Sequence, residues 1–229
     1  FILVGLFGQA VGTASYPFMS RLATEGRMLE MNRLLDRTMR ALSIVIPFSV
    51  FLMVIRHEMV FLLFQRGRFD AAATQLTAHL LPFLLLGAFA FSAQTVVVRG
   101  YYALQNTLFP ALVGTMAVLL SVPVFLLGMQ HLGASGVALG VSISAFMQVA
   151  LLYICWNRRT ENKDSRHVYG AVFKMMLLSI FLGSALEAIR QAVFSSVGDN
   201  TFLSALLTCF GMGVLFLCQI GRASCRERV

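Results

Sequence analysis

Residues 107–129, TLFPALVGTMAVLLSVPVFLLGM, form an apolar run that contains no charged side chain. A helix needs about 20 apolar residues to cross a hydrocarbon core roughly 30 Å thick, and this run meets that length. Similar runs recur along the chain and are separated by short polar loops. None of them alternates polar and apolar residues as a barrel strand does. The sequence therefore predicts an all-α fold, a polytopic transmembrane helix bundle.

The composition supports this fold class. Mean hydropathy is +0.79, hydrophobic residues make up 58% of the chain, and charged residues make up 12%, about half their share in an ordinary soluble domain. The formal net charge is +8, and the cations lie at the edges of apolar runs rather than among aromatic residues. We therefore expect membrane lipids, and no nucleic acid, as partners.

About seven helical segments are expected from these runs. They cover residues 1–20, a span at 41–55 whose entry turn starts near 32, then 71–98, 107–129, 134–156, 168–194 and a last segment from about 201. Pro82 and Gly87 lie inside the third segment, and Pro123 predicts a kink in the fourth. The longest polar linker is expected at 157–167.

Arginine and lysine residues fall mainly in every second loop. One set of loops holds Arg21, Arg27, Arg33, Arg37, Arg40, Arg99, Arg158, Arg159, Lys163 and Arg166. The other set holds Arg56, Arg66, Arg68 and Arg190. Because cation-rich loops stay in the cytoplasm, we expect the first set on that side. Arg21, Arg33, Arg37 and Arg40 would form a cytoplasmic basic face, either a topological anchor or a lipid-phosphate site.

The first segment combines small residues with a polar stripe. Gly8 and Gly12 form a small-xxx-small pair, as do Gly136 and Gly140 in the fifth segment, and such pairs let helices approach closely. The stripe recurs at helical spacing and consists of Gln9, Thr13, Tyr16 and Ser20. It is interpreted either as a hydrogen-bonding seam between helices or as the wall of a hydrated cavity.

Other polar groups lie within apolar helices, where they are costly and usually face a bundle interior or a cavity. Gln94 is the deepest polar side chain of the third segment. It is interpreted either as lining a cavity or as packing between helices. Lys174 lies about two turns from the expected cytoplasmic end of its helix, close enough to reach the interface. Glu187 and Arg190, at i and i+3, are expected to neutralise each other near the outer interface.

The sequence supports neither catalysis nor a metal site. It has no HExxH, P-loop or Gly-x-Ser-x-Gly motif, and its four histidines are scattered without metal-ligand spacing. Three cysteines, Cys155, Cys209 and Cys218, lie in or beside apolar helices, where reduced, packed thiols are the default. We therefore expect no enzyme, no metal and no cofactor.

Four stretches carry the motifs of a known family. They are Gly5-Leu6-Phe7-Gly8 with Gly12-Thr13, Pro17 and Ser20-Arg21; Asn32-Arg33-Leu34 leading to Arg40-Ala41-Leu42; Leu63-Phe64-Gln65-Arg66-Gly67-Arg68-Phe69; and Tyr102-Ala103-Leu104-Gln105-Asn106 closing at Pro110. The third resembles a Leu-Phe-x-x-Gly-x-Phe turn, and the fourth a Phe-Tyr-Ser/Ala-Arg-Gln-Asp-x-x-x-Pro corner. Together they resemble the MurJ/MviN lipid II flippases over residues 1 to about 160.

The resemblance implies a transporter of the multidrug/oligosaccharidyl-lipid/polysaccharide exporter superfamily. Residues 1–160 would belong to its second lobe, and 161–219 would form two additional C-terminal helices beside a lipid-tail groove. Such a protein lies in the bacterial cytoplasmic (inner) membrane and flips undecaprenyl-diphosphate-linked peptidoglycan precursor, lipid II, by alternating access for cell-wall biogenesis. The candidate cavity residues are Gln9, Thr13, Tyr16, Ser20, Gln94 and Arg99, and the candidate groove residues are Lys174, Glu187 and Arg190.

The corner departs from the family pattern at two positions. Leu104 stands where the family usually has an arginine, and Asn106 where it usually has an aspartate, which removes an ion pair. We hypothesise that Arg99, about one turn earlier, substitutes for the missing arginine.

Other functions stay open at this point. One is a polysaccharide-repeat flippase or a drug/cation antiporter of the same superfamily, and the antiporter would need a membrane-embedded acid, for which Glu187 is the candidate. Another is a non-transporting membrane scaffold that recruits cell-wall synthesis proteins through cytoplasmic loops. A membrane enzyme is third, and the missing acid–base constellation weakens it.

The last ten residues, 220–229, change abruptly from an apolar run to the Arg-rich string IGRASCRERV. One back-translation of this string reads like a common short-read sequencing adapter, so we expect the natural sequence to differ after Gln219. Genomic codons that continue differently past Gln219 would agree with this, and the same codons in the genome would refute it.

Overall fold

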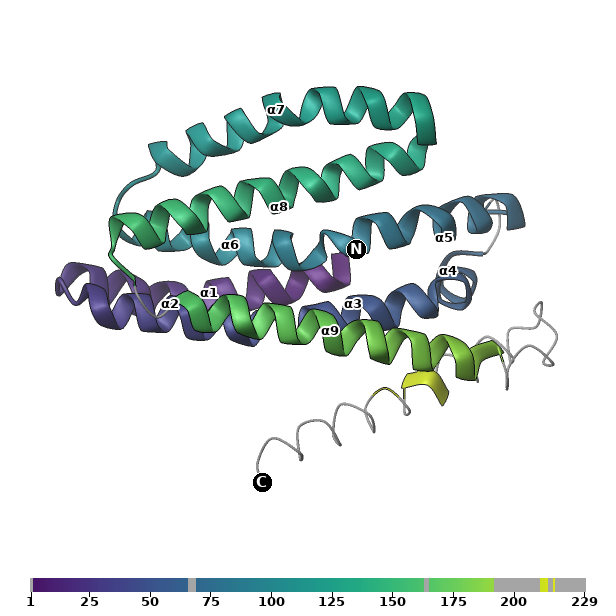
Figure 1. Ribbon diagram of the computed structural model, residues 1–229, viewed down its shortest axis with the longest axis horizontal. Coiled ribbons are helices and arrows are strands. Elements are labelled where there is room, and N and C mark those ends of the chain that lie inside the picture. Colours follow the sequence, from purple (N-terminus) through teal and green to yellow (C-terminus); the bar gives the residue numbers. More distant parts are fainter. Residues whose placement is uncertain (1, 66–68, 163–164, 192–210, 214–215, 217–229) are drawn as a thin grey trace. The chain divides into compact units, whose positions relative to one another are not determined.

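The structure is a computed structural model that describes residues 2–65, 69–162, 165–191, 211–213 and 216. Every regular element in these residues is helical, which confirms the all-α prediction (Figure 1). The helices are α1 (Ile2–Thr24), α2 (Met28–Leu42), α3 (Val45–Val54), α4 (Arg56–Phe64), α5 (Ala71–Leu86), α6 (Ala88–Ala103), α7 (Leu108–Leu132), α8 (Ala134–Arg159) and α9 (Arg166–Ile189). The helix expected from about 201 falls almost wholly outside the described residues, and the tail at 220–229 does so completely.

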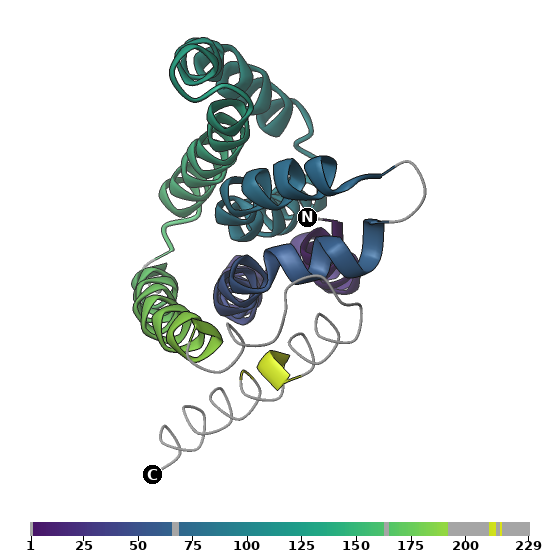
Figure 2. The same ribbon diagram turned by 90° about the vertical axis from the view of Figure 1, so that its right-hand side faces the viewer.

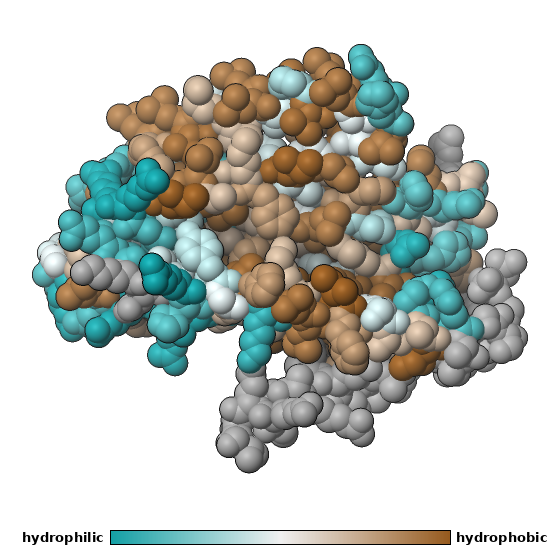
Figure 3. Space-filling view, viewed as in Figure 1, coloured by the Kyte–Doolittle hydropathy of each residue, from teal (hydrophilic) through white to brown (hydrophobic). Residues whose placement is uncertain are grey.

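Several of these helices are long and apolar enough to cross a membrane. Within the described residues they are Met28–Val54, which joins α2 and α3, then α7, α8 and α9, together with the bent pair α5 and α6. Only 11% of the most apolar part of α7 is buried, and hydrophobic side chains cover it in Figure 3. Apolar residues such as Leu112, Met116 and Leu119 are therefore exposed as they would be toward lipid tails.

The third predicted segment is not one helix, because it is divided at Gly87 into α5 and α6. The N–H of Gly87 donates to the carbonyl of Leu84 at 3.1 Å, three residues back instead of the four of a regular α-helix. The Ser142 hydroxyl of α8 donates to the carbonyl of Phe83 at 2.6 Å. A Cβ at position 87 would lie 2.6 Å from that hydroxyl oxygen, so glycine is required for this contact.

Some helix ends also differ from the prediction. α2 begins at Met28 rather than near 32, because Arg27 and Glu30 form an ion pair of 2.6 Å across its first turn. α8 continues to Arg159, where the N–H and hydroxyl of Thr160 both donate to the Trp156 carbonyl at 2.9 Å. The linker between α8 and α9 is therefore confined to residues 160–165, shorter than the predicted 157–167.

The chain divides into two compact units by its internal contacts. The first unit comprises residues 1–46 and 83–175, and the second comprises 47–82 and 176–229. In the first, Tyr101 and Trp156 are almost fully buried and their rings meet edge to face at 5.1 Å. In the second, Phe51 stacks on Phe216 at 4.6 Å. These units do not correspond to a lobe and two added helices, so the domain boundaries at 160 and 219 stay predictions.

Within the first unit, α7 and α8 lie side by side as an antiparallel pair (Figures 1 and 2). Gly136 of α8 lies against the backbone of Gly128 of α7, where even a methyl group would collide with main-chain atoms. A Cβ on Gly140 would lie 2.6 Å from the Phe125 ring. The predicted small-residue pair in this segment is therefore confirmed as a close helix contact.

Candidate functional site

Helices α1 and α6 approach each other closely through the two glycines of α1. A Cβ on Gly8 would lie 2.5 Å from the Cα of Ser92, and one on Gly12 would lie 3.3 Å from the methyl group of Thr95. The predicted role of Gly8 and Gly12 is confirmed, because each admits the neighbouring helix. This contact brings the polar stripe of α1 next to Arg99 of α6.

Arg99 forms hydrogen bonds with two residues of the predicted stripe. Its Nη1 donates to Thr13 Oγ1 at 2.6 Å and to the Gln9 carbonyl at 3.4 Å, and its Nη2 donates to Gln9 Oε1 at 3.0 Å. All of these acceptors are neutral, and none of the described carboxylates lies within ion-pair distance of Arg99. Among the described residues, no carboxylate therefore compensates the charge of this guanidinium, which lies beside exposed polar side chains.

This arrangement suits the binding of an anion. A guanidinium has five N–H donors in a planar fork, and three donor contacts are made to Gln9 and Thr13. The half-buried Arg99 is thereby held in one orientation, and its remaining N–H donors have no partner among the described residues. Guanidinium groups bind carboxylate and phosphate oxygens through such forks. We refer to Arg99, Gln9 and Thr13 as the Arg99 site.

The other two stripe residues lie further along α1. Tyr16 is 38% exposed, and Ser20 is half-buried, with its carbonyl accepting a hydrogen bond from the Thr24 hydroxyl at 2.6 Å. The stripe is thus a hydrogen-bonding seam at Gln9 and Thr13, and its role as a cavity wall stays a prediction.

Gln94 lies apart from the Arg99 site. It lines a separate cavity of about 600 Å³ formed by α6, α7 and α8, whose other polar residues include Gln148 and Thr115. Positions 94 and 99 are five residues apart along the helix, about 1.4 helical turns, so the two side chains leave α6 in different directions. The six predicted cavity residues therefore do not lie together in one site of the described structure. The helical spacing of Gln94 and Arg99 already indicates that these two side chains point in different directions.

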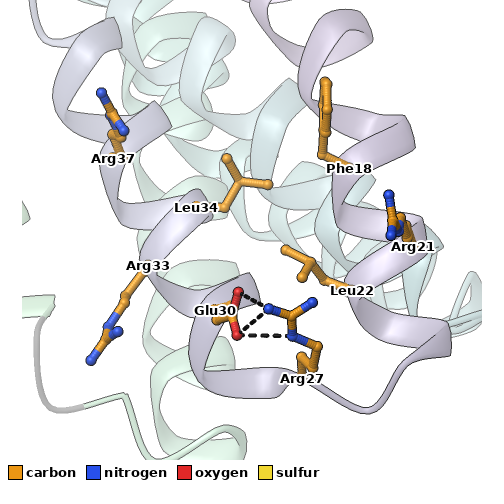
Figure 4. Close-up of a pocket in the computed structure, with 8 residues that line it drawn as sticks. All are labelled: Phe18, Arg21, Leu22, Arg27, Glu30, Arg33, Leu34 and Arg37. Atoms are coloured by element: carbon orange, nitrogen blue, oxygen red, sulfur yellow. Dashed lines mark hydrogen bonds and ion pairs between the residues drawn. The ribbon is translucent and has the colours of Figure 1, made fainter.

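The basic face of α2 is exposed as the sequence pattern indicates. Arg33, Arg37 and Arg40 all lie on the solvent-accessible side of the helix, and Arg21 lies in the last turn of α1. Arg21, Arg33 and Arg37 line a groove of about 560 Å³ between the two helices (Figure 4). Figure 3 shows hydrophilic side chains gathered at this end of α1 and α2.

The opposite face of α2 carries a buried polar network that the sequence analysis missed. Asp36 is 3% exposed and accepts hydrogen bonds from the Tyr153 hydroxyl at 2.7 Å and from Asn162 Nδ2 at 2.9 Å. Asn32 accepts one from the Trp156 indole N–H at 2.9 Å. The signal for this network was the i, i+4 spacing of Asn32 and Asp36 away from the arginine face. It attaches α2 to α8 and to the linker that follows α8.

The polar residues of the predicted segment 168–194, Lys174, Glu187 and Arg190, differ in their contacts and exposure. Glu187 and Arg190 form the predicted ion pair at 2.8 Å. Arg190 also contacts Glu58 of α4 at 3.3 Å, a partner that sequence spacing could not indicate. Lys174 is exposed on the earlier part of α9. Within the described part of the chain, no group of three or more His, Cys, Asp or Glu residues could hold a metal ion.

Comparison with known sequences identifies the family. The family model described as "Lipid II flippase MurJ" matches residues 2–217, nearly the whole chain. The chain belongs to the MurJ lipid II flippase family. Family membership and the apolar helices together make it part of a multi-pass membrane protein.

Individual MurJ relatives agree with this assignment. The chain is 30% identical over 214 residues to the "Probable lipid II flippase MurJ" of Vibrio cholerae serotype O1, covering 92% of this chain and 41% of that protein. It is 28% identical over 220 residues to the protein of the same name from Borreliella burgdorferi, covering 94% and 43%. The chain therefore spans about two fifths of the length of these MurJ proteins.

A solved MurJ structure has the same fold. The structure called "Lipid II flippase MurJ, inward closed conformation" matches with a TM-score of 0.70 at 21% sequence identity, covering 96% of this chain and 44% of that one. The match extends well past residue 160, where the sequence motifs ended. The predicted polytopic helix bundle is therefore confirmed as the MurJ fold.

Proposed function

We propose that the full-length protein flips lipid II from the inner to the outer leaflet of the bacterial cytoplasmic membrane by alternating access. The substrate consists of a diphosphate, a large sugar-peptide head and a polyprenyl tail. The head needs a hydrated cationic surface, and the tail needs an apolar path. Membership of the MurJ family supports the substrate class, and the Arg99 site supplies a positive charge without a carboxylate partner among the described residues.

The observation that carries the proposal is the geometry around Arg99. Gln9 and Thr13 hold its guanidinium at 3.0 and 2.6 Å through neutral acceptors. A phosphate oxygen can then bind to the remaining donors without first displacing an internal ion pair. Arg99 would bind the phosphate, while Gln9 and Thr13 would position it. Our hypothesis that Arg99 replaces the missing corner arginine agrees with this role.

The exposed face of α9 supports the apolar part of the path. Phe173, Ile180 and Phe181 are 63%, 69% and 74% exposed. Large apolar residues at this exposure on a membrane-spanning helix suit contact with lipid tails or with a polyprenyl chain. We propose that this face borders the lipid-tail groove, with Lys174 near its cytoplasmic end and the Glu187–Arg190 pair toward its other end.

The test is complementation by the full-length gene in cells depleted of their own lipid II flippase. Wild-type protein should restore growth, Arg99→Ala should abolish rescue, and Arg99→Lys should restore only part of it because an ammonium group lacks the planar fork. Gln105→Ala is the matched control, since Gln105 is exposed at the nearby corner. Full rescue by Arg99→Ala, with membrane expression confirmed, would overturn the role of the Arg99 site.

The same experiment separates the alternative functions. A scaffold that recruits cell-wall synthesis proteins would survive every substitution at the Arg99 site, whereas a flippase would not. Failure of the wild-type gene would favour another lipid-linked glycan as substrate. For an antiporter, the candidate acid Glu187 is held by Arg190 at 2.8 Å, and this pairing disfavours a free proton-binding carboxylate there.

A further inference from the structure

A groove between the end of α1 and the beginning of α2 combines positive charge with apolar surface. Four arginines, one glutamate and three apolar residues line its volume of about 560 Å³. Figure 4 shows Leu22 and Leu34 pointing toward each other between the two helices, with Phe18 and Arg21 on α1, Arg27 joined to Glu30, and Arg33 and Arg37 extending in different directions from α2. The groove therefore has an apolar floor and a cationic rim.

Ion pairs neutralise two of the four arginines that line this groove, Arg21 and Arg27. Arg27 pairs with Glu30 at 2.6 Å and with Glu25 at 2.9 Å, and Arg21 pairs with Glu25 at 2.7 Å. These contacts lie in the last turn of α1, in the turn that joins the helices and in the first turn of α2. Four arginines against two glutamates leave two positive charges uncompensated.

The uncompensated charges are those of Arg33 and Arg37 on α2. Both are exposed, and neither has a carboxylate partner among the described residues. They stand at i and i+4, a spacing at which like charges repel each other on a helix. An anion bound between them would remove this repulsion.

We propose that this groove is a docking site for the diphosphate of the lipid-linked substrate, separate from the Arg99 site; this inference rests on the proposed function. A diphosphate that joins a polyprenol to a sugar carries one negative charge on each phosphate, which matches the two free arginines. Guanidinium groups bind such oxygens in bidentate pairs. The substrate would dock here before it enters the transport cavity.

The apolar floor selects an amphiphile over a soluble anion. Phe18 is 65% exposed, and it lines the groove together with Leu22 and Leu34. The first isoprene units of a polyprenyl diphosphate would cover these side chains. A free inorganic anion would leave them exposed to water, and a singly charged phospholipid would neutralise only one of the two arginines.

The experiment uses the full-length flippase in phosphatidylcholine nanodiscs and proteoliposomes. Native mass spectrometry counts the bound lipid II molecules, and a flipping assay gives KM and kcat. The test variant is Arg33→Gln with Arg37→Gln. The control is Arg158→Gln with Arg159→Gln, which removes two exposed arginines from the last turn of α8, outside this groove. Helical circular dichroism and gel filtration establish that each variant folds.

We expect wild-type protein and control to bind two lipid II molecules and the test variant to bind one. Losing charge-assisted hydrogen bonds at two arginines should raise KM about tenfold or more, with kcat unchanged because the Arg99 site is intact. Unaltered stoichiometry and KM in the test variant, with active wild-type protein, would overturn the docking site alone. An inactive wild-type protein would instead contradict the proposed function, and its stoichiometry would still test the groove.

Phosphatidylglycerol provides the second arm of the experiment. If the groove takes the diphosphate lipid, an equal concentration of phosphatidylglycerol should leave the second lipid II molecule bound. Displacement of that molecule from wild-type protein, or loss of bound phosphatidylglycerol in the test variant, would identify the groove as a phospholipid site and overturn the assignment.

Discussion

Replacing Gly8 with alanine tests the contact on which the Arg99 site depends. The added Cβ would lie 2.5 Å from the Cα and 2.7 Å from the Cβ of Ser92, whereas carbon atoms pack best at roughly 3.5–4.0 Å. Because a Cα is part of the backbone, α1 and α6 must separate by roughly 1 Å. Overpacking of this kind costs about 1–3 kcal/mol. The separation would also stretch the 2.6 Å hydrogen bond between Arg99 and Thr13.

Gly5→Ala is the matched control on the same helix. No atom lies within 4 Å of a Cβ at Gly5, so this variant should gain only the helix propensity of alanine, about 0.5–1 kcal/mol. Gly8→Ala has the same gain but adds the collision. The free energies of unfolding should therefore differ by about 1–3 kcal/mol in favour of Gly5→Ala.

The assay is equilibrium unfolding of the full-length protein in mixed micelles by increasing SDS, followed by circular dichroism. Lipid II flipping is measured on the same variants reconstituted into proteoliposomes, and it should fall for Gly8→Ala and stay at the wild-type level for Gly5→Ala. Equal unfolding free energies for the two variants would refute the close contact between α1 and α6. Equal flipping despite a stability difference would show that the Arg99 site tolerates the separation.

Three further outcomes follow from particular contacts. Ser142→Ala should lower the free energy of unfolding by about 0.5–1.5 kcal/mol, since the hydrogen bond from Ser142 to the Phe83 carbonyl is lost; an unchanged SDS midpoint would contradict this. Tyr153→Phe should lower the free energy of unfolding by about 1.5–3 kcal/mol, because buried Asp36 loses a hydrogen-bond donor. In a double-mutant cycle, Tyr153→Phe should cost less when Asp36→Asn is already present. Hydrogen bonds from two arginines hold the pKa of Glu25 below its ordinary 4.5. The Glu25 carboxylate therefore stabilises the fold above pH 4.5, and this stabilisation is lost as the pH falls through the lowered pKa. Glu25→Gln should lower the thermal midpoint slightly at neutral pH and leave it unchanged in acid.

Features that depend on nearest neighbours along a helix were predictable from the sequence. The apolar run at 107–129 is membrane-spanning because its length and hydropathy allow little else. The Glu187–Arg190 pair follows from i, i+3 spacing. The glycine pairs at Gly8 and Gly136 predicted close helix contacts, although they could not name the partner helix. The exposed arginine face of α2 likewise follows from helical periodicity.

Contacts between residues far apart in the chain came only from the tertiary structure. Arg99 meets Thr13 across 86 residues, Tyr153 meets Asp36 across 117, and Arg190 meets Glu58 across 132. The break at Gly87 is a further case, because the nearby Phe83 carbonyl accepts a hydrogen bond from Ser142 of α8, 59 residues further along.

The sequence by itself therefore determined that this chain is a set of membrane helices, and where the polar stripe of α1 and the arginine face of α2 lie. Hydropathy and periodicity are local properties that each segment expresses independently of the others. Only the tertiary structure decided which polar faces meet, since the crossing of two helices depends on where glycines and small side chains allow their backbones to touch. For this reason Arg99 contacts Gln9 and Thr13, while Gln94, on the same helix, lines a cavity with residues of α7 and α8.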